Sequence, residues 1–103
     1  MLKRIEVTMW AERLSYDYLS WAKGIATRLN INGVAFFKND GSAEIVAEGE
    51  ERNLIKFVNR LKRGRFFAHF FSPIENFSAA WKEPKKEFET FFISDHSMQE
   101  FTS

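Results

Sequence analysis

The hydrophobic residues of this chain change their spacing along the sequence, and the order of those spacings limits the fold more than any other feature. Residues 4–10 alternate between apolar and polar side chains, which is typical of a half-buried strand. From residue 16 to residue 29 the apolar side chains recur at helical spacing, and Leu19 belongs to their stripe. Ser15 or Asp17 is placed to cap this helix. The chain therefore begins with a strand that is followed by a buried helix.

Two further strands and a second helix are predicted next. The apolar run 33–38 ends at an Asn-Asp-Gly sequence, and residues 43–47 then alternate again, which predicts a hairpin around the Asp-Gly turn. Acidic residues begin and basic residues end a helical pattern over 50–63, as the helix dipole favours.

The last third of the chain is less regular. Residues 65–73 contain four Phe without a clear period, and we expect a loop or an irregular strand there. Strands are predicted over 74–81 and 88–93, separated by the polar turn 82–86. This order of elements predicts an α+β, ferredoxin-like (βαββαβ) fold, a two-layer sandwich with a mostly antiparallel sheet, two helices on one face and a fifth edge strand.

Size and composition fit one domain. The chain has 103 residues, and we expect a single domain over 1–94 followed by a C-terminal tail, 95–103. It is 45% hydrophobic with 12 Phe, enough for a core, and it has no Cys, which excludes thiol catalysis and Cys-ligated zinc. No apolar run is long enough for a membrane helix and the start lacks a signal-peptide pattern, so a soluble, cytoplasmic protein is expected. The net charge of +1 offers no global field for nucleic acid.

Several segments resemble acylphosphatases in their order and spacing. Residues 40–51, DGSAEIVAEGEE, resemble that family's hairpin turn, third strand and entry to the second helix. Residues 81–84 and 87–93 resemble its closing strands, and residues 29–33 resemble the exit from its first helix. The likeness covers about residues 7–93. It implies the ferredoxin-like fold and hydrolysis of the carboxyl–phosphate bond of acyl phosphates, with no metal or organic cofactor.

The resemblance also implies where the family's site residues should stand. In acylphosphatases a loop of the form G-R-V-Q-G-V-G-F-R holds the phosphate on its backbone N–H groups, its last Arg clamps the anion, and an Asn on the second strand orients water. Here residues 11–19 occupy that loop without its glycines, Leu19 stands at the Arg position and Phe37 at the Asn position. Glu12 and Asp17 place carboxylates where a phosphate would lie. No catalytic residue is therefore predicted.

Three functions remain open. The first is a catalytically inactive, acylphosphatase-like binding or structural module. The second is an active acylphosphatase, for which Arg13 or Lys38 would supply the missing cation. The third is a single-stranded RNA-binding module, suggested by residues 63–70; these lie after the second helix rather than before it, and the strand that should carry such a motif is expected to expose Glu44 and Glu48.

A cluster of aromatic residues suggests a partner. Strand alternation would leave about half of the cluster facing outward, so we predict a contact surface for a second copy or another protein. The alternatives are burial under the loop or cover from Met98 and Phe101 of the tail. The candidate contact residues are Phe66, Phe67, Phe70 and Phe71.

The remaining polar groups favour ordinary structural roles. His69 and His96 have no ligand spacing to a carboxylate, so no metal site is predicted. The cations of the second helix are typical of a solvated helix face: Lys56, Arg60, Lys62 and Arg63.

Overall fold

The computed structural model describes residues 1–10, 15–63, 65–67, 70–72 and 76–94. Along the chain lie β1 (Leu2–Trp10), α1 (Tyr16–Arg28), β2 (Asn32–Phe37), β3 (Ala43–Glu50), α2 (Glu51–Arg63), β4 (Arg65–Phe67), β5 (Phe70–Ser72), β6 (Asn76–Lys82) and β7 (Phe91–Ile93). Five strands form one sheet in the order β6-β1-β3-β2-β7, and β4 pairs with β5 in a second, two-stranded sheet.

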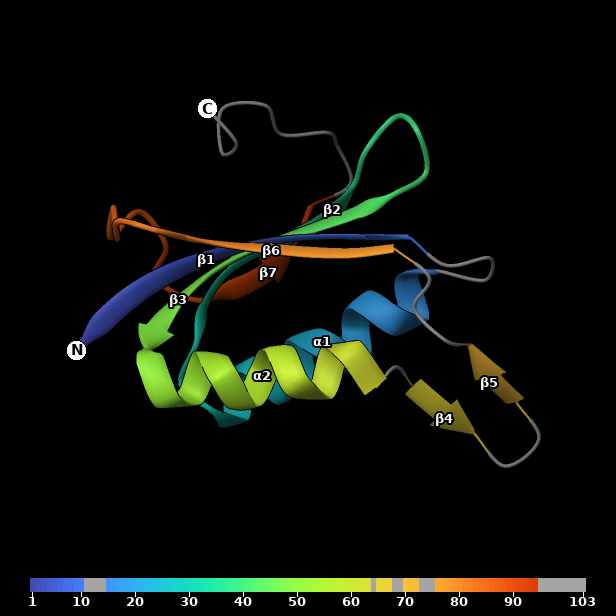
Figure 1. The fold of residues 1–103 in the computed structure, drawn as a ribbon, viewed down its shortest axis with the longest axis horizontal. Helices are drawn as coiled ribbons and strands as arrows, with labels where there is room; N and C mark the ends of the chain where they lie inside the picture. Colours follow the sequence, from blue (N-terminus) through green and yellow to red (C-terminus); the bar gives the residue numbers. More distant parts are fainter. Residues whose placement is uncertain (11–14, 64, 68–69, 73–75, 95–103) are drawn as a thin grey trace.

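The sheet confirms the ferredoxin-like prediction. All neighbouring strands of the five-stranded sheet run antiparallel except β2 and β7, which run parallel. Both helices cover one face of that sheet (Figure 1). The fifth strand, β7, lies at the sheet edge as expected.

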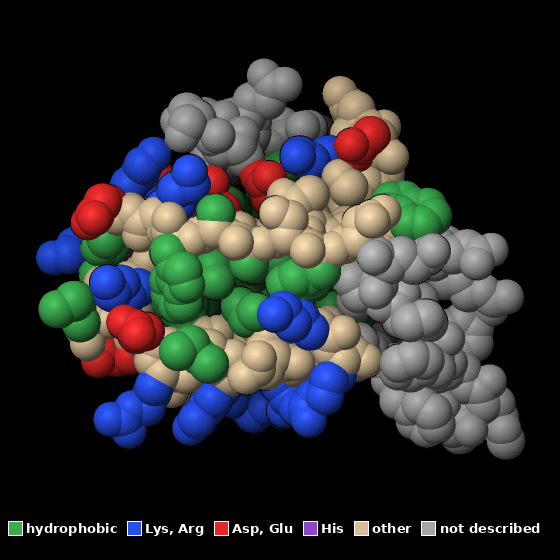
Figure 2. Space-filling view, viewed as in Figure 1, with side chains coloured by type: hydrophobic (Ala, Val, Ile, Leu, Met, Phe, Trp, Pro, Cys, Tyr) green, Lys and Arg blue, Asp and Glu red, His purple; other side chains and the backbone are tan. Residues whose placement is uncertain are grey.

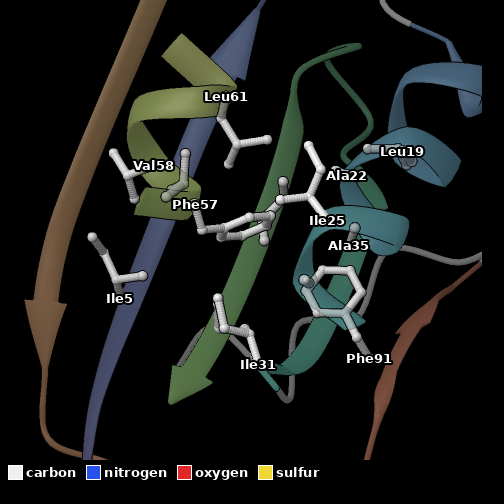
Figure 3. Close-up of a cluster of buried hydrophobic side chains, with 14 of the residues drawn as sticks. Ile5, Leu19, Ala22, Ile25, Ile31, Ala35, Phe57, Val58, Leu61 and Phe91 are labelled. Carbon is white, nitrogen blue, oxygen red and sulfur yellow. The ribbon is translucent and has the colours of Figure 1, made fainter. Parts of the chain in front are cut away.

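The main core lies between the helices and the sheet, and Figure 3 shows its central side chains. The predicted faces are confirmed, because the alternate apolar residues of β1 and the stripes of both helices are buried there. Phe57 of α2 meets Phe91 of β7 edge to face, with ring centroids 6.0 Å apart. Leu19 is completely buried in this core.

A left-handed turn connects α1 to β2 and brings two backbones together. Asn30 has a φ of 57°, and a Cβ built on Gly33 would lie 2.0 Å from the carbonyl oxygen of Val46 on β3. Only glycine fits at this position, because any side chain would collide with the neighbouring strand.

Two sequence expectations for the last third were wrong in detail. Residues 65–67 and 70–72 form a hairpin rather than a loop or a single irregular strand, with Phe66 opposite Phe71 and Phe67 opposite Phe70. The last strand spans only Phe91–Ile93. Phe88 precedes it and packs in a second apolar cluster on the other face of the sheet, beside Phe36. An apolar residue stands at position 88 because it packs in this cluster, and not because it belongs to the alternation of a strand.

Neither α1 nor α2 is long and apolar enough to cross a membrane, and these are the helices of the described part of the chain.

Candidate functional site

The start of α1 lies against the end of β2, where the resemblance places the phosphate site. The rings of Tyr16 and Phe37 meet edge to face at 5.1 Å between centroids. Phe37 is half-buried and packs against the main core, and Leu19 is fully buried. Ser15 is the N-cap residue, but its side chain makes no capping hydrogen bond, and Asp17 lies in the first helical turn. Both positions that the resemblance assigns to polar site residues thus belong to apolar packing.

The cation nearest in sequence to Phe37 already has a counter-ion. The Nζ of Lys38 lies 3.5 Å from Oε1 of Glu44. Thr8 also donates to that oxygen, at 3.4 Å, while the buried Oε2 of Glu44 has no hydrogen-bond partner among the described residues. Arg13, the other cation considered, and Glu12 lie outside the described residues. Lys38 is therefore held by a buried carboxylate.

A cavity of about 660 Å³ opens at the end of β1. Among its described lining residues only Asp40 carries a formal charge, and hydrogen bonds from Ser42 lower the pKa of the Asp40 carboxyl. A negative group in this position suits a neutral or cationic guest better than a phosphate. The described lining consists of Thr8, Met9, Trp10, Asp40, Ser42, Asn76, Phe77 and Ser78.

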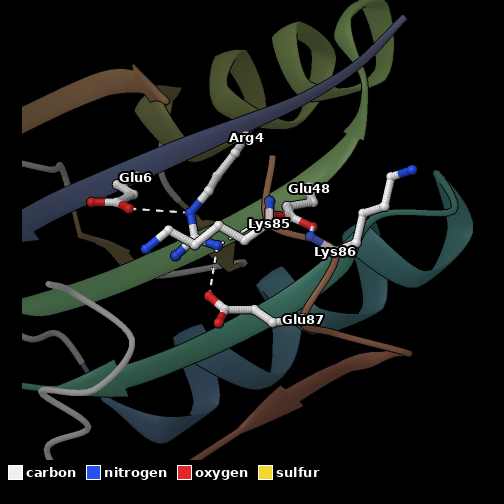
Figure 4. A network of polar contacts seen from close by, with 6 residues as sticks. All are labelled: Arg4, Glu6, Glu48, Lys85, Lys86 and Glu87. Atoms are coloured by element: carbon white, nitrogen blue, oxygen red, sulfur yellow. Dashed lines mark hydrogen bonds and ion pairs between the residues drawn. The ribbon is translucent and has the colours of Figure 1, made fainter. Parts of the chain in front are cut away.

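The face of the sheet away from the helices carries a buried polar network centred on Arg4 (Figure 4). The guanidinium of Arg4 is completely buried and lies 3.2 Å from Glu6, 3.1 Å from Glu48 and 2.7 Å from Glu87. Its Cζ lies 5.7 Å from the ring centroid of Phe88. Burial alone would lower the pKa of Arg4, but the hydrogen bonds to the three carboxylates outweigh it and raise that pKa. Three carboxylates surround the one guanidinium, so the charge of Arg4 is fully engaged and is not available to an anionic ligand.

This network also corrects the expectation that Glu44 and Glu48 are exposed. Both are buried, at 6% and 4% exposure. Glu48 accepts hydrogen bonds from the backbone N–H groups of Lys85 and Lys86, at 2.7 and 3.0 Å, because the segment before β7 crosses over this part of the sheet. Repulsion between exposed glutamates and the RNA backbone is therefore not the reason to disfavour RNA binding. Around Glu48 the sheet surface is covered by the segment before β7.

The other predicted candidates are only partly described. The backbone that carries Phe66, Phe67, Phe70 and Phe71 forms the β4–β5 hairpin, which extends beyond the end of α2 (Figure 1), but the positions of those side chains lie outside the described residues. His69, His96 and the tail 95–103 also lie outside them. Within the described part of the chain, no group of three or more His, Asp or Glu residues could hold a metal ion.

Sequence reasoning missed two arginines. Arg4 stands at a polar position of the alternating segment 4–10, yet it is fully buried. Arg28 was not singled out, yet it joins Lys56, Arg60 and Arg63 around one groove. The pairing of Arg4 with Glu48 spans 44 residues and depends on strand register, so the sequence carries no local signal for it. The position of Arg28 depends on how α1 packs against α2.

Comparisons with known proteins agree with this fold. The acylphosphatase family model matches residues 15–93. A curated acylphosphatase from Caldanaerobacter subterraneus subsp. tengcongensis is 35% identical over 68 residues, which cover 66% of this chain and 71% of that protein. Another from Lacticaseibacillus paracasei is 38% identical over 72 residues, covering 69% and 71%. The crystal structure of acylphosphatase from Bacillus subtilis superposes with a TM-score of 0.78 at 23% identity, covering 91% of this chain and 99% of that one.

The class is thus an α+β sandwich of the ferredoxin-like type. Within that class, the chain belongs to the acylphosphatase family.

Proposed function

We propose that this chain is a member of the acylphosphatase family that does not hydrolyse acyl phosphates and works as a small binding module. The observation that carries the proposal is the complete burial of Leu19 in the main core. By the family resemblance this position should present a guanidinium to phosphate, and a leucine in the core can present neither charge nor hydrogen bonds.

The surroundings of Leu19 support the same proposal. Phosphoryl transfer is catalysed mainly by positioning and by neutralising charge that develops in the transition state. The Phe37 ring packs against Tyr16, and Lys38 is paired with Glu44. Loss of one oxyanion donor costs about 2.7–4 kcal/mol of transition-state stabilisation, and here the clamp and the water-positioning amide are both replaced.

A second candidate is an active acylphosphatase. It is favoured by the curated relatives, which carry that name at 35% and 38% identity. On this reading, a cation from the segment between β1 and α1 would take the place of the family's Arg, and the family's site positions would be shifted by a few residues along this chain.

A hydrolysis assay separates the two. We expect the purified chain to leave benzoyl phosphate decaying at its spontaneous rate, because no described cation is free at the start of α1. The acylphosphatase from Caldanaerobacter subterraneus subsp. tengcongensis, assayed in parallel, is the positive control. Saturable turnover by this chain that inorganic phosphate inhibits competitively would establish the active enzyme instead.

A further inference from the structure

A groove runs between α1 and α2 on the helix layer, away from the site discussed above. Its volume is about 360 Å³, within the range of small-molecule sites. Arg28 of α1 and Lys56, Arg60 and Arg63 of α2 line it. Figure 2 shows Lys and Arg side chains gathered along the edge of the molecule that the helices form.

The cations of α2 face the groove because of their spacing. Residues 56, 60 and 63 follow one another by four and three positions, which places them on one side of a helix. Lys62 departs from this spacing, and its Nζ lies 5.6 Å from the ring centroid of Phe77 instead. The predicted solvated cluster therefore divides into three groove cations and one outside it.

The groove cations lack counter-ions in the described structure. None of the four lies within ion-pair distance of a described carboxylate, and no acidic residue is among the described lining residues. Arg60 instead lies over the ring of Trp21, at 5.9 Å from its centroid. Like charges four residues apart on a helix repel each other, so this arrangement disfavours the free protein and favours an anion in the groove.

The groove also offers an apolar wall. Ile25 of α1 is almost fully buried and Leu29 is half-buried, and both line the groove between the cations. Arginine forks match phosphate oxygens in a bidentate geometry, and the neighbouring apolar surface accommodates a carbon skeleton. A guest that uses both features carries a phosphate group and an apolar or aromatic body.

We propose that this groove binds a small organic phosphate, with the phosphate held by Arg28 and Arg60 and the organic part against Ile25 and Leu29. The proposal goes beyond the function proposed above and does not depend on it, since the groove and the start of α1 are separate and the chain could bind here whether or not it hydrolyses acyl phosphates.

The test uses phenylphosphonate, which has no acyl–phosphate bond to hydrolyse, and inorganic phosphate, each titrated into the full chain by calorimetry and by amide NMR shifts. We expect phenylphosphonate to bind at least threefold more tightly than inorganic phosphate, because only it contacts the apolar wall. We expect its amide shifts to concentrate at residues 25–29 and 56–63, and its affinity to fall as salt is added.

A charge-matched pair of double variants makes the test specific. Arg28→Gln with Arg60→Gln should weaken phenylphosphonate binding at least tenfold. Arg52→Gln with Lys62→Gln removes the same charge from α2 outside the groove and should change the affinity less than twofold. All four residues are solvent-exposed, each double variant removes one cation that lies over an aromatic ring (Arg60 over Trp21, Lys62 over Phe77), and melting curves of both variants verify that they fold.

Four outcomes would overturn the proposal. The first is that phenylphosphonate does not bind at 10 mM, and the second is that the two double variants lose the same amount of affinity for it. The third is that the amide shifts are confined to residues 15–19. The fourth is that a single-stranded oligonucleotide saturates the chain while phenylphosphonate does not bind at all. The third outcome would also contradict the function proposed above, whereas turnover of benzoyl phosphate with intact groove binding would contradict that function alone.

Discussion

Tyr18 shows how one buried hydroxyl joins the two helices. Its side chain is 5% exposed, and its hydroxyl donates a hydrogen bond to the carbonyl oxygen of Leu61 at 3.1 Å, linking the first turn of α1 to the last turns of α2. Burial raises the pKa of the Tyr18 phenol. Because burial disfavours the ionised phenolate in the folded chain but not in the unfolded chain, this residue makes the free energy of unfolding depend on pH in the alkaline range.

The sign of that dependence follows from the direction of the shift. A phenol in the unfolded chain ionises near pH 10, while Tyr18 in the folded chain stays neutral beyond it. The contribution of Tyr18 to the free energy of unfolding is complete below about pH 10 and is lost as pH rises further. At pH 11 the parent chain should have lost about 1.4 kcal/mol through this residue, a loss that Tyr18→Phe should not show.

Urea denaturation at pH 8 and pH 11 measures both free energies of unfolding. Tyr18→Phe should start about 1 kcal/mol less stable at pH 8, because the bond to Leu61 is gone. Tyr16→Phe is the control, since the ring of Tyr16 is half-exposed, and it should retain the alkaline loss of the parent. Equal losses in Tyr18→Phe and the parent would contradict the assignment.

At the scale of elements, the Arg4 network fastens the segment before β7 to the sheet. Glu48 of β3 is its central acceptor, because it takes the Arg4 guanidinium and two backbone N–H groups of residues 85 and 86 at once. Glu87 adds a second link to Arg4 from the same segment. That segment is thereby held over the apolar cluster around Phe88.

Glu48→Ala should destabilise the fold by about 3–5 kcal/mol, because a buried guanidinium loses a partner and two N–H groups lose their acceptor. Glu50→Ala is the matched control on the same strand. Glu50 is exposed and pairs only with the N-terminal amine among the described contacts, so it should cost about 0–1 kcal/mol. Thermal or urea unfolding of both variants gives the comparison, and similar losses would refute a structural role for the network.

The elements with a strict hydrophobic period could be predicted from the sequence, and those held by distant contacts could not. The alternation around Ile5 and the stripe through Leu19 predicted β1, α1 and the burial of Leu19. The short β7 and the position of Phe88 depend on packing against β2 and β3, which no local pattern encodes. The cationic groove could not be predicted either, because Arg28 joins the cations of α2 only through the packing of α1 on α2.

At the scale of the whole molecule, the β4–β5 hairpin stands apart from the five-stranded sheet. It forms its own two-stranded sheet and projects beyond the helix layer (Figure 1). Isolated two-stranded hairpins are marginal in water. A contact with a second copy or another protein through the four Phe residues of this hairpin therefore remains our prediction.

Sedimentation velocity over a range of concentrations tests that contact. We expect association that becomes at least tenfold weaker when Phe66 and Phe70 are both changed to Ser. Trp81→Ser is the control, because Trp81 is a half-exposed aromatic on β6, outside the hairpin. The prediction would be wrong if the parent chain stayed monomeric at every concentration, or if Trp81→Ser weakened the association as much as the double variant.

The burial of Leu19 has a consequence for the history of the chain under the proposed function. An arginine restored at that position would have to bring its charge into the apolar interior before any substrate was present to compensate it, which costs several kcal/mol in a domain of marginal stability. No single substitution there could regain hydrolysis without first endangering the fold. Natural variants of this chain should accordingly differ mainly at surface residues, while position 19 stays aliphatic.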